Sequence, residues 1–237
     1  MPEGPEVKSM VIQLNTFLKG KTLHQIVLHS GRYSKKSPDN FINFIQTLPL
    51  KIIEVRNKGK FIWFQFDGLW TMWNTLGMTG GWKLEKDKHS HYEFILDNDK
   101  SLWFNDIRNF GTLKFCSSLE EFEKKLKSLG PDVLEDEFTP DILENLLKQN
   151  KLKDKTLPEI FMNQRYLSGI GNYLKSEILY ESKISPHRKL VDLNQNDIEK
   201  LYKNIKKISL ASLKAGGATI RNYSNIDNEV GNYVFEF

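Results

Sequence analysis

The feature that most limits the fold of this chain is a change in hydrophobic period about half-way along it. Up to about residue 129, apolar residues mostly alternate with polar ones in short runs, after one helical stretch at the start; beyond residue 140 they recur every three to four positions. Alternation buries one face of a strand, whereas a period near 3.6 buries one stripe of a helix. The sequence therefore predicts an α+β fold: an N-terminal helix and a two-layered β-sandwich, followed by a helical domain.

The boundary between the two parts is expected in residues 130–140, which read GPDVLEDEFTP. This stretch is acidic and punctuated by Gly and Pro, which is typical of interdomain linkers. We predict an N-terminal domain over residues 1–130, a linker over 131–140 and a helical domain over 141–237. Strands are predicted at Thr22–His29, Lys51–Arg56, Phe61–Phe66, Leu69–Asn74, Tyr92–Leu96 and Ser101–Asn105. Helices are predicted at Pro5–Leu18, Pro38–Leu48, Glu120–Leu129, Asp141–Gln149, Lys155–Met162, Asn172–Ser182 and Gln195–Ala215, with a weak strand at Tyr233–Phe237.

Composition narrows the class of protein. The chain has 237 residues, 39% of them hydrophobic, so it can bury a substantial core. No apolar run approaches the ~20 residues that span a bilayer, and the start lacks the basic and apolar regions of a signal peptide. Cys116 is the only cysteine, so an internal disulfide is excluded and a reducing, intracellular compartment is expected, nuclear or cytoplasmic according to the source. The net charge of +4 is compatible with nucleic-acid binding.

The first six residues, MPEGPE, carry the strongest chemical signal. Removal of Met1 would leave Pro2 with a free secondary amine. An α-amine has a pKa near 7.7–8.0, against about 10.4 for lysine, so more of it is neutral at pH 7. The neutral amine attacks carbonyl carbons to form a Schiff base, and Glu3 beside it could carry protons. The residues alone leave open the simpler interpretation of a Pro-punctuated helix start, with Glu6 holding backbone amides near that start.

A second signal lies in residues 162–185, where a tight turn carries Gly169 and Gly171 between two predicted helices. Asn172 is a favourable N-cap type for the second helix. Free amides at that helix start would form an anion site suited to a DNA phosphate. A plain packing turn is the competing interpretation.

MPEGPE together with GIGNYLKSEILY resembles the formamidopyrimidine-DNA glycosylase/endonuclease VIII family of base-excision repair enzymes. The second element resembles the helix-two-turn-helix of that family. The Gly-Pro-Glu form of the start is more similar to endonuclease VIII. Other stretches match in the same order, and they are Arg56–Phe61, Leu76–Gly80, Asp106–Gly111, Gly130–Asp132 and Gly216–Thr219.

The resemblance implies a bifunctional DNA glycosylase and AP lyase that removes oxidised bases, pyrimidines in particular, through a Schiff base and β/δ-elimination. Pro2 is then the nucleophile that attacks C1′ of the damaged nucleotide. Glu3 transfers protons, and Lys60 is a catalytic cation near that nucleotide's phosphate. Without the resemblance, Lys60 would be interpreted as a solvated strand-edge lysine, and the resemblance reverses that interpretation. The implied partner is damaged DNA, with no membrane and no cofactor, and the protein is expected to be a monomer.

The resemblance also implies DNA-binding residues. Met78, Arg108 and Phe110 fill the gap that an extruded base leaves, although Met and Phe are more often core residues. Asn172 grips phosphate. Arg221, after the turn at residues 216–217, is a candidate contact to phosphate or base.

Two features limit the match. Members of the family generally continue into a C-terminal zinc finger or hairpin, whereas this chain ends at Phe237, so we expect the finger to be absent. His89 and His91 share strand spacing but no third ligand is apparent, so no metal site is predicted. The alternative function is a non-catalytic module that binds lesions or abasic sites in DNA.

Overall fold

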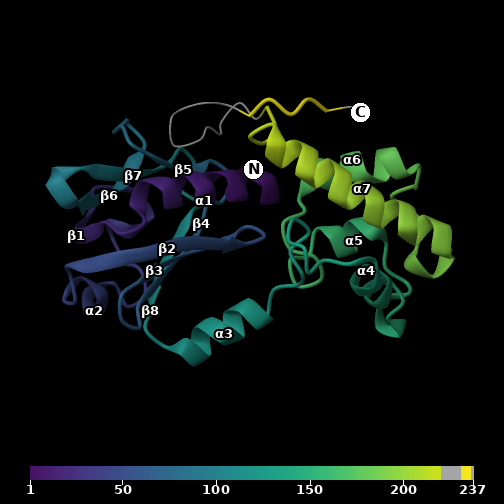
Figure 1. Cartoon of the computed structure of the whole chain (residues 1–237), viewed down its shortest axis with the longest axis horizontal. Helices are drawn as coiled ribbons and strands as arrows, with labels where there is room; N and C mark the ends of the chain where they lie inside the picture. Colours follow the sequence, from purple (N-terminus) through teal and green to yellow (C-terminus); the bar gives the residue numbers. More distant parts are fainter. Residues whose placement is uncertain (220–230, 236–237) are drawn as a thin grey trace.

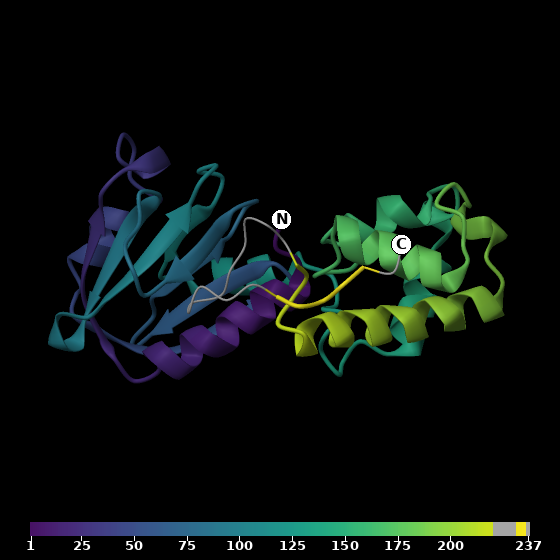
Figure 2. The same ribbon diagram turned by 90° about the horizontal axis from the view of Figure 1, so that it is seen from above.

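The computed structural model describes residues 1–219 and 231–235. A part built on a β-sheet and a part built of helices lie side by side, and the N-terminus lies at their junction (Figures 1 and 2). The fold class expected from the change of period is therefore confirmed: an N-terminal helix and antiparallel β-structure precede a helical domain.

The strands form one antiparallel sheet in the order β5-β7-β6-β1-β2-β3-β4-β8. The pairing between β1 and β2 consists of only two residue pairs, Thr22 with Lys51 and Leu23 with Leu50, so the sheet divides there into two four-stranded halves. The halves face each other, because the Phe64 ring of β3 lies 5.2 Å from Trp82 of β5 and 6.0 Å from Phe94 of β6. The strands are β1 (Thr22–Leu28), β2 (Leu50–Lys58), β3 (Phe61–Phe66), β4 (Thr71–Thr75), β5 (Gly80–Lys83), β6 (Ser90–Leu96), β7 (Ser101–Asp106) and β8 (Thr112–Cys116).

Helix α1 (Gly4–Leu18) lies against β2 and completes the core of the sheet part (Figure 1). Its apolar residues recur three and four positions apart, so they form one buried stripe of Val7, Met10, Val11, Leu14 and Leu18. Asn15 fixes its position along the strand, because the side-chain oxygen accepts a hydrogen bond of 2.7 Å from the backbone N–H of Val55. This packing directs the first residue of α1 toward the junction.

The helical part surrounds a second core that α6 and α7 dominate. Side chains of Thr139 and Asn194 accept hydrogen bonds from the first turns of α4 and α7, which explains where those helices begin. The helices after α1 are α2 (Phe41–Ile45), α3 (Leu119–Lys127), α4 (Pro140–Leu147), α5 (Leu157–Phe161), α6 (Asn172–Ser182) and α7 (Gln195–Lys214). Short 3-10 turns cover Gly31–Tyr33, Asp97–Asp99, Asn150–Leu152 and Leu190–Asp192.

Some elements differ from the expected ones. Strands β5 and β8 were not predicted, and α2 is shorter than the expected helix at residues 38–48. The segment at 131–139 is packed, because Val133 and Phe138 belong to the core of the helical part. The proposed domain bounds of 1–130 and 141–237 remain a prediction.

Candidate active site

Glu3 connects the two parts of the molecule. It is the N-cap of α1, and its backbone N–H donates to Glu6 Oε2 at 2.7 Å. Its own carboxylate reaches the start of α6, where it accepts hydrogen bonds from the backbone N–H groups of Gly171 (2.7 Å), Tyr173 (2.9 Å) and Leu174 (3.2 Å). Glu3 is buried, with 2% of its surface exposed. One carboxylate therefore satisfies the first turn of a helix in the other part of the chain.

This contact corrects the expectation for the helix start at Asn172. The N-cap of α6 is Gly171, and Asn172 is the first helical residue. Three of the amides at this helix start, those of Gly171, Tyr173 and Leu174, are occupied by Glu3, because a buried helix N-terminus attracts the carboxylate that the fold brings next to it. Asn172 itself is exposed, and its side-chain oxygen accepts a hydrogen bond of 2.8 Å from Lys175. Its contact with DNA remains a prediction.

Glu3 and Lys60 converge on Gly171. A Cβ atom at Gly171 would lie 2.3 Å from Glu3 Cδ and 2.5 Å from Lys60 Nζ, so only glycine leaves room for both side chains. Burial raises the pKa of Glu3, and the charge of Lys60 opposes that change. Burial lowers the pKa of Lys60, and the charge of Glu3 opposes that change. Both shifts move the pKa of the group toward neutral pH, which favours proton transfer by these side chains.

Glu6 ties the start of α1 to α6 and to the 217–218 turn, and through Tyr173 to α7. Fully buried, it accepts hydrogen bonds from the hydroxyl of Tyr173 at 2.9 Å and from the backbone N–H of Ala218 at 2.7 Å. The Tyr173 hydroxyl also lies 3.0 Å from Ser212 Oγ on α7. Burial and the charge of Glu6 raise the pKa of Tyr173 well above its ordinary value, so this hydroxyl stays neutral. The sequence indicated that Glu6 would hold amides near its own helix; its contacts with α6 and the 217–218 turn carried no local signal.

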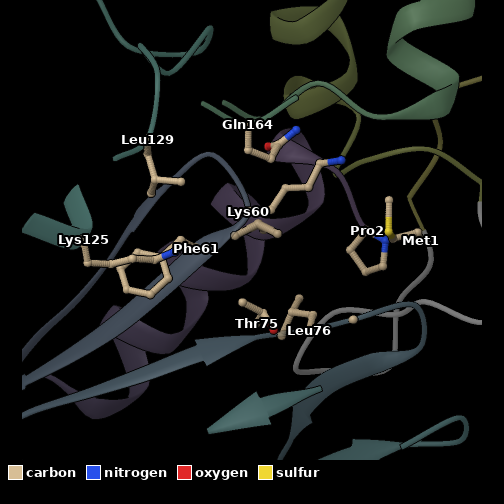
Figure 3. A pocket seen from close by; sticks show the side chains of 11 residues that line it. Met1, Pro2, Lys60, Phe61, Thr75, Leu76, Lys125, Leu129 and Gln164 are labelled. Carbon is tan, nitrogen blue, oxygen red and sulfur yellow. The ribbon is translucent and has the colours of Figure 1, made fainter. Parts of the chain in front are cut away.

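A pocket of about 260 Å³ opens beside Pro2 (Figure 3). Pro2 is buried and Met1 is partly exposed at the pocket wall. The other lining residues come from both parts of the chain. They belong to α1, the turn between β2 and β3, β3, β4 and the loop after it, α3 and the loop after it, and the loop before α6. These residues are Val7, Lys60, Phe61, Thr75, Leu76, Gly77, Lys125, Leu129 and Gln164. The predicted nucleophile and cation, Pro2 and Lys60, thus line one cavity at the junction of the two parts. The predicted acid, Glu3, follows Pro2 in the chain and meets Lys60 at Gly171.

The three residues expected to replace an extruded base, Met78, Arg108 and Phe110, lie on two adjoining loops and are called the wedge residues below. The exposed fractions of Met78 and Phe110 are 36% and 51%, so neither is a core residue. The Arg108 guanidinium lies 4.9 Å from the centre of the Phe110 ring. The loops touch, because a Cβ on Gly77 would lie 2.8 Å from the Phe110 carbonyl carbon. Since Gly77 also lines the pocket, the wedge residues stand at its edge.

The Asp106 carboxylate holds these two loops together. Its Oδ1 accepts hydrogen bonds from Thr79 Oγ1 at 2.5 Å and from the backbone N–H of Arg108 at 3.2 Å. Its Oδ2 accepts one from the backbone N–H of Gly111 at 2.6 Å. Asp106 is 1% exposed, so these bonds are shielded from water. The wedge loops are therefore held in shape before DNA arrives.

His91 supports the same loop from behind. Its Nε2 lies 2.8 Å from the backbone oxygen of Asp106, and its Nδ1 lies 2.8 Å from Ser30 Oγ. Both ring nitrogens are thus engaged in protein hydrogen bonds. The residues at 1–219 and 231–235 contain no group of three His, Cys, Asp or Glu side chains that could hold a metal ion. Arg221, the remaining predicted DNA contact, lies outside the described residues.

Two family models match the chain along most of its length. The formamidopyrimidine-DNA glycosylase N-terminal domain matches residues 1–113, and the formamidopyrimidine-DNA glycosylase H2TH domain matches residues 129–224. The chain belongs to the formamidopyrimidine-DNA glycosylase family. Formamidopyrimidine-DNA glycosylase from Carboxydothermus hydrogenoformans is 33% identical over 98% of this chain and 85% of its own length. The enzyme of the same name from Bacillus cereus is 30% identical over the same shares.

Solved structures of formamidopyrimidine-DNA glycosylases share the fold. The MutM (Fpg) protein of Thermus thermophilus superposes with a TM-score of 0.84 at 27% identity, covering 97% of this chain and 84% of that one. Lactococcus lactis Fpg in complex with DNA containing N7-benzyl-Fapy-dG superposes with a TM-score of 0.83 at 25% identity, covering 98% and 85%. No helix in the described part of this family member is both long and apolar enough to cross a bilayer.

Proposed function

We propose that this chain is a DNA glycosylase of base-excision repair that also acts as an AP lyase through the amine of Pro2. The observation that supports the proposal is that Pro2 and Lys60 line one cavity, with Glu3 against Lys60 at Gly171 and the wedge residues at the cavity edge. Damaged DNA is the partner, and the protein acts as a monomer. A substrate in genomic DNA supports an intracellular location, in the nucleus or in the cytoplasm and nucleoid according to the source.

The covalent steps follow from the chemistry of a secondary amine. The Pro2 nitrogen attacks C1′ of the damaged nucleotide, and the base leaves with the electrons of its glycosidic bond. The sugar ring opens as its ring oxygen takes a proton, which the protonated form of Glu3 supplies. The resulting iminium acidifies the C2′ proton, whose removal expels the 3′ phosphate; a second elimination expels the 5′ phosphate, and water then releases Pro2. Lys60 stabilises phosphate charge beside the reacting sugar.

The wedge residues support the preceding step, in which the damaged base leaves the helix. Extrusion costs a few kcal/mol in lost stacking and pairing. Apolar side chains inserted into the gap recover part of that cost. The Arg108 guanidinium can hydrogen-bond the base left without a partner. Because Asp106 and His91 already hold the loop, little ordering is needed on binding.

The substrate class has two candidates, each with one supporting observation. Relatives bear the name formamidopyrimidine-DNA glycosylase, and a mutant of the Lactococcus lactis enzyme was solved in complex with DNA containing Fapy-dG, which supports formamidopyrimidine purines. The Gly4-Pro5-Glu6 start resembles endonuclease VIII, which supports oxidised pyrimidines. Excision from duplexes that carry either lesion, compared under single-turnover conditions, decides between them.

Borohydride trapping on abasic DNA tests the proposal. The reduced adduct should map to Pro2, and a chain whose N-terminal amine is acetylated should form none. An adduct that maps to an internal lysine would refute Pro2 as the nucleophile. The alternative, a non-catalytic module that binds lesions, predicts DNA binding without trapping, and retention of Met1 in the mass of the mature chain would favour it.

A further inference from the structure

Helix α3 presents Lys125 to the pocket beside Pro2, whereas Lys124 and Lys127 are exposed. Phe122 and Leu126 pack against the aromatic cluster of the sheet part. The carbonyls of Leu126 and Leu129 accept hydrogen bonds of 3.1 and 3.0 Å from Lys58 Nζ, which fixes the end of the helix. Lys125 therefore lines the cavity, as Figure 3 shows.

Lys125 differs from the other lysines of this region in its partners. Lys127 pairs with Glu123 at 3.1 Å, and Lys114 pairs with Glu121, whereas no ion pair found in the described residues includes Lys125. Its ammonium instead lies 4.9 Å from the centre of the Phe61 ring, at the pocket wall. The carboxylates of α3 next to it are thus already engaged by other lysines.

The environment of Lys125 favours an anion that is not part of the protein. Burial lowers the pKa of Lys125, and the charge of Arg165 from the helical part lowers it further. Lys60 lines the same cavity, so positive charge comes from two walls. An anion placed there would offset the burial of Lys125 and the repulsion that Arg165 exerts on it. The cavity of about 260 Å³ is smaller than the ~300–1,000 Å³ pockets that enclose whole drug-sized ligands, and suits part of a nucleotide.

We propose that Lys125 binds a backbone phosphate of the damaged strand, at the end of the pocket away from Pro2, while Lys60 serves the reacting nucleotide. The inference rests on the proposed function, because it takes DNA as the ligand. A phosphate held there fixes the strand next to the lesion while C1′ lies at the Pro2 amine. Lys125 is thus a further DNA-binding residue that neither the motifs nor the family match indicates.

The test is the salt dependence of affinity for a duplex that carries a tetrahydrofuran abasic analogue, measured by fluorescence anisotropy. One lost phosphate contact should flatten the slope of log affinity against log salt by about 0.9. The variant Lys125→Met keeps the apolar stem on Phe61 and removes the charge. Between 50 and 200 mM salt, its affinity should therefore fall about 3.5-fold less than that of the unchanged chain. Lys125→Arg should keep the original slope.

Lys124→Met is the matched control, because Lys124 neighbours Lys125 on α3 but is exposed. It should leave the slope unchanged, and melting temperatures establish that all variants fold. An unchanged slope in Lys125→Met, or an equal flattening in Lys124→Met, would overturn the inference. Borohydride trapping of the unchanged chain separates the two proposals. If the unchanged chain neither forms a trapped adduct nor binds the duplex, the proposed function fails. If it forms the adduct and Lys125→Met keeps the original salt slope, only the role of Lys125 is refuted.

Discussion

Replacement of Glu3 by Gln tests the capping of α6 and the transfer of protons in one variant. The carboxylate accepts two hydrogen bonds at Oε2, from Gly171 and Leu174, and one at Oε1, from Tyr173. A Gln side chain can place its oxygen at only one of these positions, so its NH₂ group then faces a buried N–H. A buried donor without an acceptor costs about 1–3 kcal/mol. For a chain of this size that corresponds to a decrease in melting temperature of roughly 2–12 °C.

The same variant should lower the rate of base excision. Gln cannot exchange a proton, and general acid–base help contributes about 10²–10⁴-fold. Single-turnover excision of an intact oxidised base, at saturating enzyme and below the melting temperature, measures this loss separately from binding. Glu199→Gln is the control, because Glu199 is an exposed carboxylate on α7.

The stability of the variant should also depend less on pH. Burial raises the pKa of Glu3 above its ordinary value of 4.5, so the folded chain holds this proton to higher pH than the unfolded chain. The group's contribution to the free energy of unfolding is then complete below pH 4.5 and is lost as pH rises through the raised pKa. Denaturant titrations should show this decline in the unchanged chain and a smaller one in Glu3→Gln. A normal excision rate would remove Glu3 from proton transfer, and an unaltered melting temperature would refute the capping argument.

Three further predictions concern other residues. Gly171→Ala should place a methyl group against Glu3 and Lys60, destabilise the fold by about 1–3 kcal/mol and abolish trapping; trapping at the normal rate would contradict the close approach. His91→Ala should lose two hydrogen bonds behind the wedge loop and slow excision from duplex DNA more than from single strands, since only a duplex leaves an unpaired base; equal losses would indicate a general folding defect. Chelation should leave the melting temperature unchanged, because no cysteine follows Cys116 and His187 is the only later histidine; stoichiometric metal in elemental analysis would contradict this.

The parts of the fold that the sequence predicted depend on local patterns. The bounds of β3 and α6 were predicted residue for residue, and α1 was predicted to within one residue at its start. Strand β5 was missed because four residues that begin with two glycines show no alternation. Strand β8 alternates Leu113 and Phe115 inward over five residues, which is a signal of a half-buried strand, so its omission from the predicted strands has no physical reason.

In the candidate site, too, only the residues that belong to local sequence motifs were predicted. Motifs indicated Pro2, Glu3 and Lys60 as candidates. The structure brings Pro2 and Lys60 to one cavity and Glu3 against Lys60 at Gly171. The capping of α6 by Glu3 could not be predicted, because no pattern within a short window relates residue 3 to residue 171. A weak signal was present at Gly171: glycine is a poorer cap than Ser, Asp or Asn, so a buried helix that starts there needs an acceptor from elsewhere. Lys125 was missed because a lysine among lysines on an amphipathic helix reads as solvated surface.

The bond from Glu3 to α6 also sets an order in time during synthesis of the protein. At about 5–20 residues per second, a ribosome adds Leu174 roughly 9–34 s after Glu3. Throughout that interval a chain that has lost Met1 would carry the free amine of Pro2, but α6 and the cavity at the junction would not yet have formed. An unfinished chain is therefore expected to be inert toward sugar aldehydes, and competence should appear only when the second part folds against the first. The N-terminal amine of this protein is therefore synthesised first, and its active site is completed last.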